Sequence, residues 1–488
     1  MSGVIDGRAY ARPKYDAVVV GAGPNGLSAA ITLARAKLST LLIEAHATPG
    51  GGARTQELTL PGFLHDVCST VHPLGVASPF FRTLDLAGHG LQWIFPPAPL
   101  AHVLADGRAV MLEKSVTDTA AELGPDGTSY ESLFRPFVER CEPLLEMVLG
   151  PLRWPSAPLL LARFGMTALG SLERLAHARF KGEAARALLA GMSAHAMQPL
   201  AAPATAAFAL ILGLTGHAIG WPIARGGSQA IIRALSATLR ELGGELRLNQ
   251  RVTQLAELPS ARAYLFDLTP RQVLQIAGGA LPARYRQRLA RFRYGPGVFK
   301  MDWALSAPIP WRDSACARAA TVHLSGSLED IARAESAVQR GRVSNQPFVI
   351  VVQPSLFDAS RAPAGLHTAW AYCHVPHGSE IDLSRQIERQ IERFAPGFAT
   401  SILARASKAA PDMERYNENY VGGDINGGAA TLRQLFTRPL ARIDPYATPS
   451  PNLFICSSST PPGGGVHGMC GYWAAQSALR GVFGGKGS

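Results

Sequence analysis

The stretch YDAVVVGAGPNGLSAAITLA, residues 15–34, decides the fold. Its first six residues, Tyr15–Val20, are mostly apolar and predict a buried strand. A glycine-rich turn follows at once, and residues 27–34 have the composition of a helix. Thr40–Ile43 predicts a second strand, which Glu44 closes. A strand, a G-x-G-x-x-G turn, a helix, a strand and then an acidic residue form the pattern of a dinucleotide-binding βαβ unit.

Each residue of the turn has an expected task. Gly21 makes the tight turn, and Gly23 leaves room for a pyrophosphate to approach the backbone. Gly26 lets the helix pack closely against the strand. The helix begins at Pro24 and Asn25, and its positive dipole end faces the phosphates. We therefore expect these five residues to bind the cofactor.

The acidic residue after the second strand selects among dinucleotides. Glu44 stands 23 residues after Gly21 and is expected to accept hydrogen bonds from ribose hydroxyls, with Ala45 beside it. A carboxylate at this position repels a 2′-phosphate, so NADP is disfavoured.

A second glycine cluster distinguishes NAD from FAD. In TPGGGART, residues 48–55, Arg54 follows Gly51 and Gly52 and can neutralise the same pyrophosphate. Simple NAD dehydrogenases do not need this loop. Here the sequence resembles the FAD-dependent amine oxidase and phytoene desaturase superfamily, as does PGFLHDV at 61–67. The resemblance implies FAD, held without a covalent link, and adds Thr55 to the residues expected to bind it.

The resemblance continues along most of the chain. Residues 224–255 read as loop, helix, strand and strand, and the strand residue matching Val252 meets the adenine in this superfamily. YLFDLTP, residues 264–270, resembles the strand that leads to a loop near the flavin. NYVGGDINGGA, residues 419–429, looks closest to the branch of pyridine nucleotide-disulphide oxidoreductase domain-containing protein 2 and bacterial phytoene desaturase-like proteins.

The C-terminal glycine loop completes the pattern. A strand at 453–456 feeds SSSTPPGGGVHGMCGY, residues 457–472, and a helix is expected from about Trp473. The resemblance implies that this loop closes over the ribityl chain and the flavin ring. The residues expected to bind FAD here are Ser459, Gly465, Val466 and His467.

These patterns predict an α/β fold with two domains. We expect a discontinuous Rossmann-like FAD-binding domain from residues 1–70, 221–290 and 411–488. A second, α+β substrate-binding domain is expected from residues 71–220 and 291–410.

Four side chains are candidates for catalysis. Lys300 lies in an apolar, strand-like run, and the resemblance implies a lysine bonded through water to flavin N5; the alternative is a solvent-facing lysine that pairs with Asp302. His467 is the titratable side chain of the glycine loop and could move a proton, or could simply be fixed by backbone hydrogen bonds. Tyr472 could line the same wall, and His72 could approach the flavin or substrate.

The composition argues against several other classes of function. The 488 residues, with 47% hydrophobic and 17% charged, fit a globular protein of two cores. The net charge of +11 is dispersed without a basic stripe, which argues against nucleic acid. No Cys-x-x-Cys pair supports a redox dithiol. His374 and His377 have no accompanying carboxylate or thiolate cluster, so we predict no metal.

Residues 187–224 carry no Asp, Glu, Lys or Arg, a length that would permit a membrane span. Because three prolines and two histidines interrupt the segment, we favour buried helices around an apolar cavity, with membrane-surface contact as the alternative. Residues 1–14 lack the apolar core of a secretory signal, so a cytoplasmic location is expected, with membrane association open. The oligomeric state is undecided, and a homodimer is one alternative.

Three functions remain. The leading prediction is an FAD-dependent oxidoreductase that dehydrogenates, saturates or isomerises a carbon–carbon bond of an apolar, lipid- or carotenoid-like substrate by hydride transfer to flavin N5. The alternatives are a flavin amine oxidase that releases hydrogen peroxide, which Lys300 favours, and a non-catalytic FAD-binding scaffold.

Overall fold

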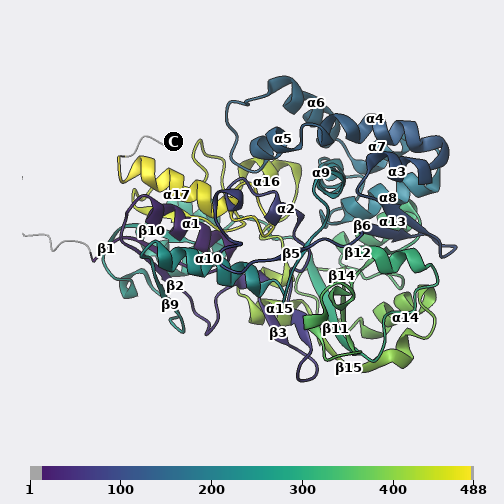
Figure 1. Cartoon of the computed structure of the whole chain (residues 1–488). Coiled ribbons are helices and arrows are strands. Elements are labelled where there is room, and N and C mark those ends of the chain that lie inside the picture. Colours follow the sequence, from purple (N-terminus) through teal and green to yellow (C-terminus); the bar gives the residue numbers. More distant parts are fainter. Residues whose placement is uncertain (1–13, 485–488) are drawn as a thin grey trace, which may run out of the picture.

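The computed structural model describes residues 14–484, in which two sheets lie side by side, each covered by helices (Figure 1). The segment on which the expectation of no secretory signal depends, residues 1–13, lies outside the described residues.

The first sheet has five parallel strands in the order β16-β10-β1-β2-β9. They are β1 (Tyr15–Val20), β2 (Thr40–Ile43), β9 (Glu245–Arg247), β10 (Ala261–Phe266) and β16 (Leu453–Ile455). Chain segments more than two hundred residues apart thus share one Rossmann-like sheet, which confirms the predicted fold class.

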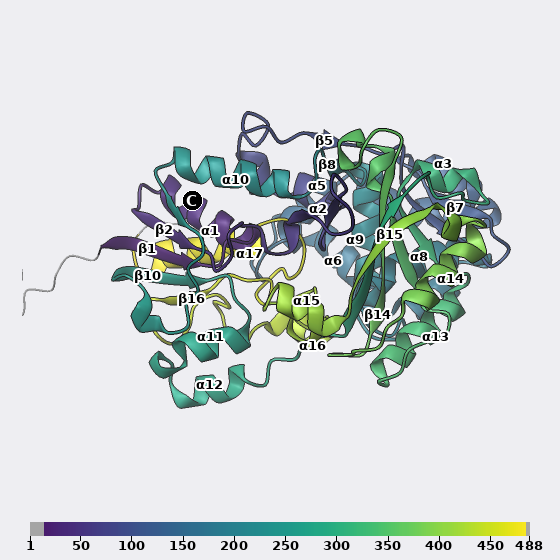
Figure 2. The same ribbon diagram turned by 90° about the horizontal axis from the view of Figure 1, so that it is seen from below.

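Strand alternation explains how this sheet is covered. In β1, Ala17 and Val19 face one side, whereas Val18 and Val20 face the other. Figure 2 shows α10 on one side of the sheet and α11 and α12 on the other. The covering helices are α1 (Pro24–Arg35), α10 (Gln229–Glu241) and α17 (Met469–Gly481) on the first side, and α11 (Pro270–Ala277) and α12 (Ala283–Leu289) on the second.

The second sheet has seven strands in the order β15-β11-β14-β13-β12-β6-β7, antiparallel except for the parallel pair β6 and β12. The strands are β6 (Ala98–Val103), β7 (Ala109–Leu112), β11 (Gly297–Leu305), β12 (Ala319–Leu324), β13 (Val349–Val352), β14 (His367–Val375) and β15 (Ile402–Lys408). One face packs its apolar residues on α14 (Ser384–Phe394). The opposite face carries a mixture of apolar and polar side chains toward the site.

Helices cover that opposite face and extend over the top of the molecule in Figure 1. They are α3 (Val116–Glu122), α4 (Gly127–Val138), α5 (Cys141–Val148), α6 (Pro158–Ala168), α7 (Leu172–Arg179), α8 (Glu183–Ala194), α9 (Thr205–Ala218) and α13 (Leu328–Gln339). Short elements join the two lobes: α2 (Pro73–Val76), α15 (Ala410–Tyr416), α16 (Leu432–Thr437), and the strand pairs β3 (Thr55–Glu57) with β4 (Leu64–Asp66) and β5 (Trp93–Ile94) with β8 (Ile223–Ala224).

The uncharged segment 187–224 forms most of α8 and α9, which pack against each other. Within residues 14–484, no helix is both long and apolar enough to cross a membrane. Three residues of this segment border the larger cavity described below: His195, Leu212 and Trp221.

Two expected boundaries are wrong. Val252 does not lie in a strand, because the chain leaves the sheet after β9 and turns at Asn249, whose φ is +56°. The C-terminal helix α17 begins at Met469 rather than near Trp473, because Gly468, its N-cap, turns the chain there with a φ of +69°; His467 Nδ1 accepts a hydrogen bond from the Met469 N–H at 3.0 Å.

Candidate functional site

Two cavities of about 310 and 260 Å³ meet at the carboxyl end of the parallel sheet. Five residues line both of them: Gly23, Gly51, Asp267, Asn417 and Asn419. In parallel α/β sheets, ligands bind in the crevice outside the carboxyl ends of the strands. The two cavities therefore make one elongated site, with the glycine turn at its middle.

The glycine turn is shaped for close backbone approach. Gly21 has a φ of +98°, and a Cβ on Gly26 would lie 1.9 Å from the Gly21 carbonyl oxygen. Gly51 faces Gly23 so closely that its Cβ would lie 3.4 Å from the Gly23 Cα. Helix α1 begins after Gly23 without a side-chain cap, and Asn25 Oδ1 is buried with no partner among the described residues. The Gly26 N–H already donates to Asp267, and the remaining N–H groups of this helix start, next to the bare glycines, fit a pyrophosphate.

Both polar and apolar side chains line the smaller cavity. Glu44, Ala45, Arg54 and Val252 all line it, as does Ile276 of α11. A carboxylate for ribose hydroxyls beside aliphatic side chains suits an adenosine. The residues present thus fit the nucleotide end of a dinucleotide.

Glu44 and Arg54 form a buried ion pair across the two glycine loops. Glu44 Oε1 lies 3.3 Å from Arg54 Nη2, and Glu44 Oε2 accepts a hydrogen bond from the Ala22 N–H at 2.8 Å. The Arg54 guanidinium also packs over the Tyr416 ring, 5.4 Å from its centroid. The pair keeps a cation next to the cradle and joins both loops to the end of β2.

Asp267 is a site residue that the sequence reasoning missed. Its carboxyl oxygen Oδ2 accepts a hydrogen bond from the Gly26 N–H at 2.9 Å, and the side chain lines both cavities. Burial raises the pKa of Asp267 well above its usual value, which lessens the repulsion between this carboxyl and a phosphate. Its place directly after β10, at the carboxyl end of a parallel strand, was the available signal.

The far end of the larger cavity is apolar and aromatic. Its walls come from α9, the segment after it, β13 and β14. The apolar and aromatic side chains at this end are Leu212, Trp221, Ile350, Val352, Trp370 and Tyr372. The rings of Trp370 and Tyr372 stack side by side, with centroids 5.8 Å apart and planes 14° apart. Among the described residues, the larger cavity is lined by one carboxyl, Asp267, and by no lysine or arginine.

None of the four catalytic candidates lines either cavity. Lys300 is fully buried, pairs with Asp302, and lies 5.2 Å from the centre of the Trp370 ring. Strand alternation causes this burial, because Phe299 and Met301 take the opposite face of β11 against α14. The lysine therefore stands one side chain behind the cavity wall, and it does not face solvent.

The other three candidates have structural partners. His72 Nε2 lies 2.7 Å from the Ser228 hydroxyl, and burial lowers the pKa of His72 to about 4. Burial also lowers the pKa of His467 to about 4, and its Nδ1 accepts the hydrogen bond from the Met469 N–H, while Gly465 and Val466 line the larger cavity. Tyr472 stacks on Phe80 and borders a separate surface depression.

Among the other expected cofactor residues, Pro24, Asn25, Gly52 and Ser459 line the larger cavity. Thr55 instead donates a hydrogen bond to Asp66 Oδ1 at 2.6 Å. Its hydroxyl therefore supports the glycine loop from behind rather than facing the site.

Comparison with known proteins agrees with this geometry. Residues 19–85 match the family model for an NAD(P)-binding Rossmann-like domain. Pyridine nucleotide-disulfide oxidoreductase domain-containing protein 2 of Mus musculus is 27% identical, over 96% of this chain and 94% of that protein. Phytoene desaturase (lycopene-forming) of a Paracoccus species is 22% identical, over 93% of this chain and 95% of that protein. The chain is an oxidoreductase that is homologous to both of these proteins over nearly its whole length.

The fold also resembles that of an amine oxidase. A solved putrescine oxidase structure superimposes with a TM-score of 0.62 at 16% identity, covering 96% of this chain and 99% of that one. Within the described part of the chain, no group of three or more His, Cys, Asp or Glu side chains could hold a metal ion.

Proposed function

We propose that this oxidoreductase binds FAD across the two connected cavities and acts on a carbon–carbon bond of an apolar substrate. The smaller cavity receives the adenosine, and the glycine turn receives the pyrophosphate. The larger cavity receives the flavin ring and the substrate. When bound, FAD accepts or supplies a hydride, and the protein orients the substrate against it.

The observation that carries this proposal is the change from polar backbone to apolar side chains along the lining of the larger cavity. Backbone-rich glycine and serine loops form one end, and aromatic and aliphatic side chains form the other. A charged substrate in such a pocket needs a partner of opposite charge, because burying an unpaired charge is costly. Asp267, whose pKa is raised by burial, lies at the cofactor end, and no lysine or arginine lines the cavity, so the apolar end favours a neutral substrate.

The test is a flavin spectrum of the purified protein, followed by anaerobic bleaching with a panel of lipids, carotenoids and amines. Bleaching by a neutral apolar compound supports the proposal. Absence of a flavin spectrum, even after reconstitution with FAD, overturns it. A bound flavin that no substrate bleaches would favour the scaffold function.

Amine oxidation is the second candidate, and one observation favours it: a buried ammonium, Lys300, lies directly behind the Trp370 wall. This function predicts peroxide release with a primary or secondary amine, and slower flavin oxidation in Lys300→Met. Equal oxidation rates in the variant and the wild type would remove Lys300 from that mechanism. The absence of a second carboxyl from the described lining weighs against an ammonium substrate.

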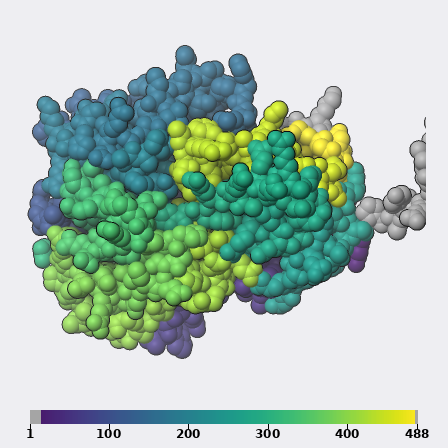
Figure 3. Space-filling view, turned by 180° about the vertical axis from the view of Figure 1, so that it is seen from behind, coloured from purple at the N-terminus to yellow at the C-terminus, as the bar shows by residue number. Residues whose placement is uncertain are grey.

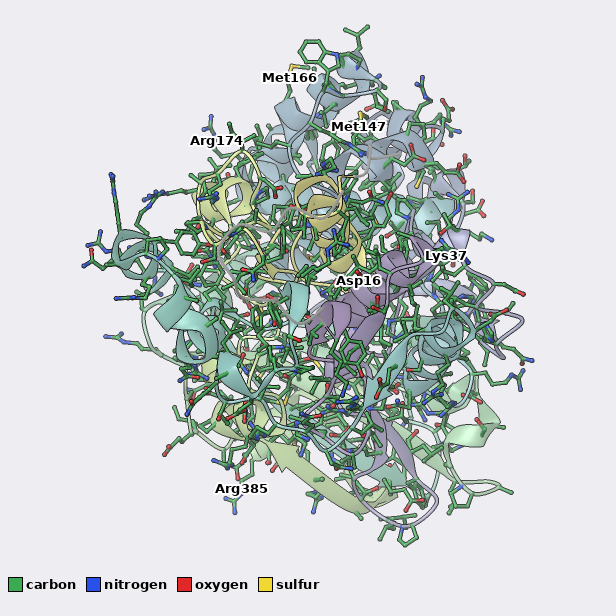
Figure 4. The ribbon with its side chains drawn as sticks, turned by 90° about the vertical axis from the view of Figure 1, so that its left-hand side faces the viewer. Asp16, Lys37, Met147, Met166, Arg174 and Arg385 are labelled. Atoms are coloured by element: carbon green, nitrogen blue, oxygen red, sulfur yellow. The ribbon has the colours of Figure 1, made fainter. Side chains whose placement is uncertain are left out.

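We further propose that the protein docks on an anionic membrane surface through the segment 152–169. Five of the twelve large hydrophobic side chains exposed in the described residues lie in these 18 positions. Within this segment, the largest exposed fractions are those of Trp154 at 92%, Leu159 at 88%, Met166 at 80% and Leu152 at 76%. Figure 3 shows the blue segment that contains α5 and α6 along the upper edge of the molecule, and Met166 lies at the outer tip in Figure 4.

Chemistry and position make lipid the expected occupant. Exposed Arg153 and Arg163 stand among the apolar side chains and suit anionic headgroups. Helix α6 packs on α9, and Leu212 of α9 lines the larger cavity. An apolar substrate leaving the bilayer would therefore arrive close to the site.

The test is co-sedimentation with phosphatidylglycerol vesicles. Trp154→Ser/Leu159→Ser is expected to lose most vesicle binding, whereas the matched variant Ile381→Ser/Leu403→Ser, at exposed positions before α14 and in β15, keeps it. Equal binding of both variants would contradict this docking surface. Self-association of the wild type that the first variant abolishes would indicate a second copy of the chain instead.

A further inference from the structure

Three buried histidines and one partly buried histidine lie behind or beside the apolar end of the larger cavity. His102, His323 and His374 belong to β6, β12 and β14, and strand alternation turns all three toward the helical layer. His195 follows α8 directly. Of these four, His195 alone lines the cavity. The cluster has no part in the proposed cofactor site, so its hydrogen bonds require a separate explanation.

One N–H proton lies between the Nε2 atoms of His195 and His323, and one of the two rings carries it. Their Nε2 atoms lie 3.1 Å apart, and one of them must donate to the other. Burial lowers the pKa of His195 to about 3 and that of His323 well below its usual value, so both rings are neutral. Two arrangements remain, which differ in the ring that donates.

The surroundings of His323 decide between them. His323 Nδ1 is buried and has no hydrogen-bond partner among the described residues. It faces the backbone of Gly191, whose Cβ would lie 2.6 Å away. A proton on this nitrogen would be an orphaned buried N–H, which is rarer in proteins than an unpaired acceptor. His323 therefore carries its proton on Nε2 and donates it to His195.

His195 must then carry its own proton on Nδ1. Among residues 14–484, His195 Nδ1 has no hydrogen-bond partner. The atom is not fully buried, because it is missing from the fully buried side-chain atoms without a partner. The imidazole lies beside Trp221, 6.5 Å between ring centroids, in the apolar part of the cavity wall. His102 offers no competing donor there, because its Nε2–H donates to the Gly326 carbonyl at 2.8 Å.

We propose that His195 donates a hydrogen bond from Nδ1 to a neutral oxygen acceptor, a carbonyl or hydroxyl, on an otherwise apolar substrate. His323 is the positioning residue that fixes the tautomer of His195. This inference rests on the proposed function, since it specifies the substrate of the same cavity. An N–H donor cannot accept a hydrogen bond from an ammonium, so the arrangement selects against protonated amines.

The first test reads the tautomer directly. ¹⁵N-histidine NMR of the purified holoprotein, with the His195 signals assigned by their loss in His195→Gln, should show a protonated Nδ1 and a bare Nε2. His323→Phe should release this preference, whereas the matched variant His102→Phe should retain it. A bare Nδ1 in the wild type would overturn the proposal, whether or not the variants fold.

The second test compares two ligands of nearly equal shape, 2-decalone and decalin, by calorimetric titration of the wild type. A neutral hydrogen bond predicts about 3- to 10-fold tighter binding of the ketone, and His195→Phe should abolish the difference. Equal binding of both ligands would overturn the proposal. Failure of the proposed function itself would be seen separately, as absence of bound flavin, and the tautomer remains measurable in that protein.

Discussion

Replacement of Gly26 by alanine tests the cofactor cradle most directly. The added Cβ would lie 1.9 Å from the Gly21 carbonyl oxygen, whereas real Cβ contacts essentially never fall below 3.0 Å. Both atoms belong to the backbone or are rigidly attached to it, so a rotamer change cannot relieve the contact. The turn or the start of α1 must therefore move by roughly 1 Å.

The size of the expected effect on FAD affinity follows from the cost of overpacking a rigid turn. Overpacking of a rigid site typically costs about 1–3 kcal/mol. The Gly26 N–H also donates to Asp267, and this hydrogen bond is disturbed by the same movement. If about 2–3 kcal/mol of the strain is expressed in the site, FAD binds about 30- to 150-fold more weakly.

The assay is titration of the apoprotein with FAD, followed by flavin fluorescence, together with urea unfolding of the apoprotein. Gly279→Ala is the matched control, because a Cβ there meets nothing within 4 Å. The control should bind FAD as the wild type does. Wild-type affinity and stability in Gly26→Ala would refute the close packing of the turn. Unchanged affinity with reduced stability would refute its role in the cradle.

Three further predictions concern buried titratable side chains. Asp302→Asn should lower the free energy of unfolding by about 3–5 kcal/mol, because Lys300 is left unpaired. The double variant Lys300→Met/Asp302→Leu should recover most of this loss. Equal losses of unfolding free energy in the single and the double variant, measured by urea unfolding, would contradict this prediction. In Arg361→Met, the unpaired Asp66 carboxylate should lower thermal stability most at neutral pH, and the deficit should shrink as acid protonates it. In the wild type, burial opposes the shift, but Arg361 is the main partner that lowers the pKa of Asp66. The stability that the ionised Asp66 contributes is therefore present above pH about 4 and is lost as the pH falls through the lowered pKa. His467→Asn, saturated with FAD, should keep its turnover within a few-fold, whereas a loss of about 100-fold or more would indicate proton transfer by His467.

The cofactor half of the site is the part that local sequence predicts well. Strand β1, the glycine turn, α1 and Glu44 are adjacent in the chain, so their spacing alone specifies the geometry. The alternation of apolar residues in β1 likewise predicts a sheet covered on both faces. Asp267 was missed because its partner, Gly26, lies 241 positions away.

The substrate half could not be predicted in the same way. Lys300 and His467 are conspicuous in the sequence because they interrupt apolar or glycine-rich runs, yet both are turned away from the cavity. His195 looks unremarkable in a long uncharged segment, but the end of α8 brings it to the wall. The direction of a side chain depends on which face of a strand or helix the rest of the fold covers.

By itself, the sequence determined the Rossmann-like unit and its glycine turn, because these depend on residues close together in the chain. Only the tertiary structure decided that Lys300 pairs with Asp302, that Asp267 enters the cradle, and that His195 and His323 share a proton. Each of these contacts joins chemically ordinary residues. Their significance comes from burial in a shared low-dielectric interior, where every polar atom needs a partner.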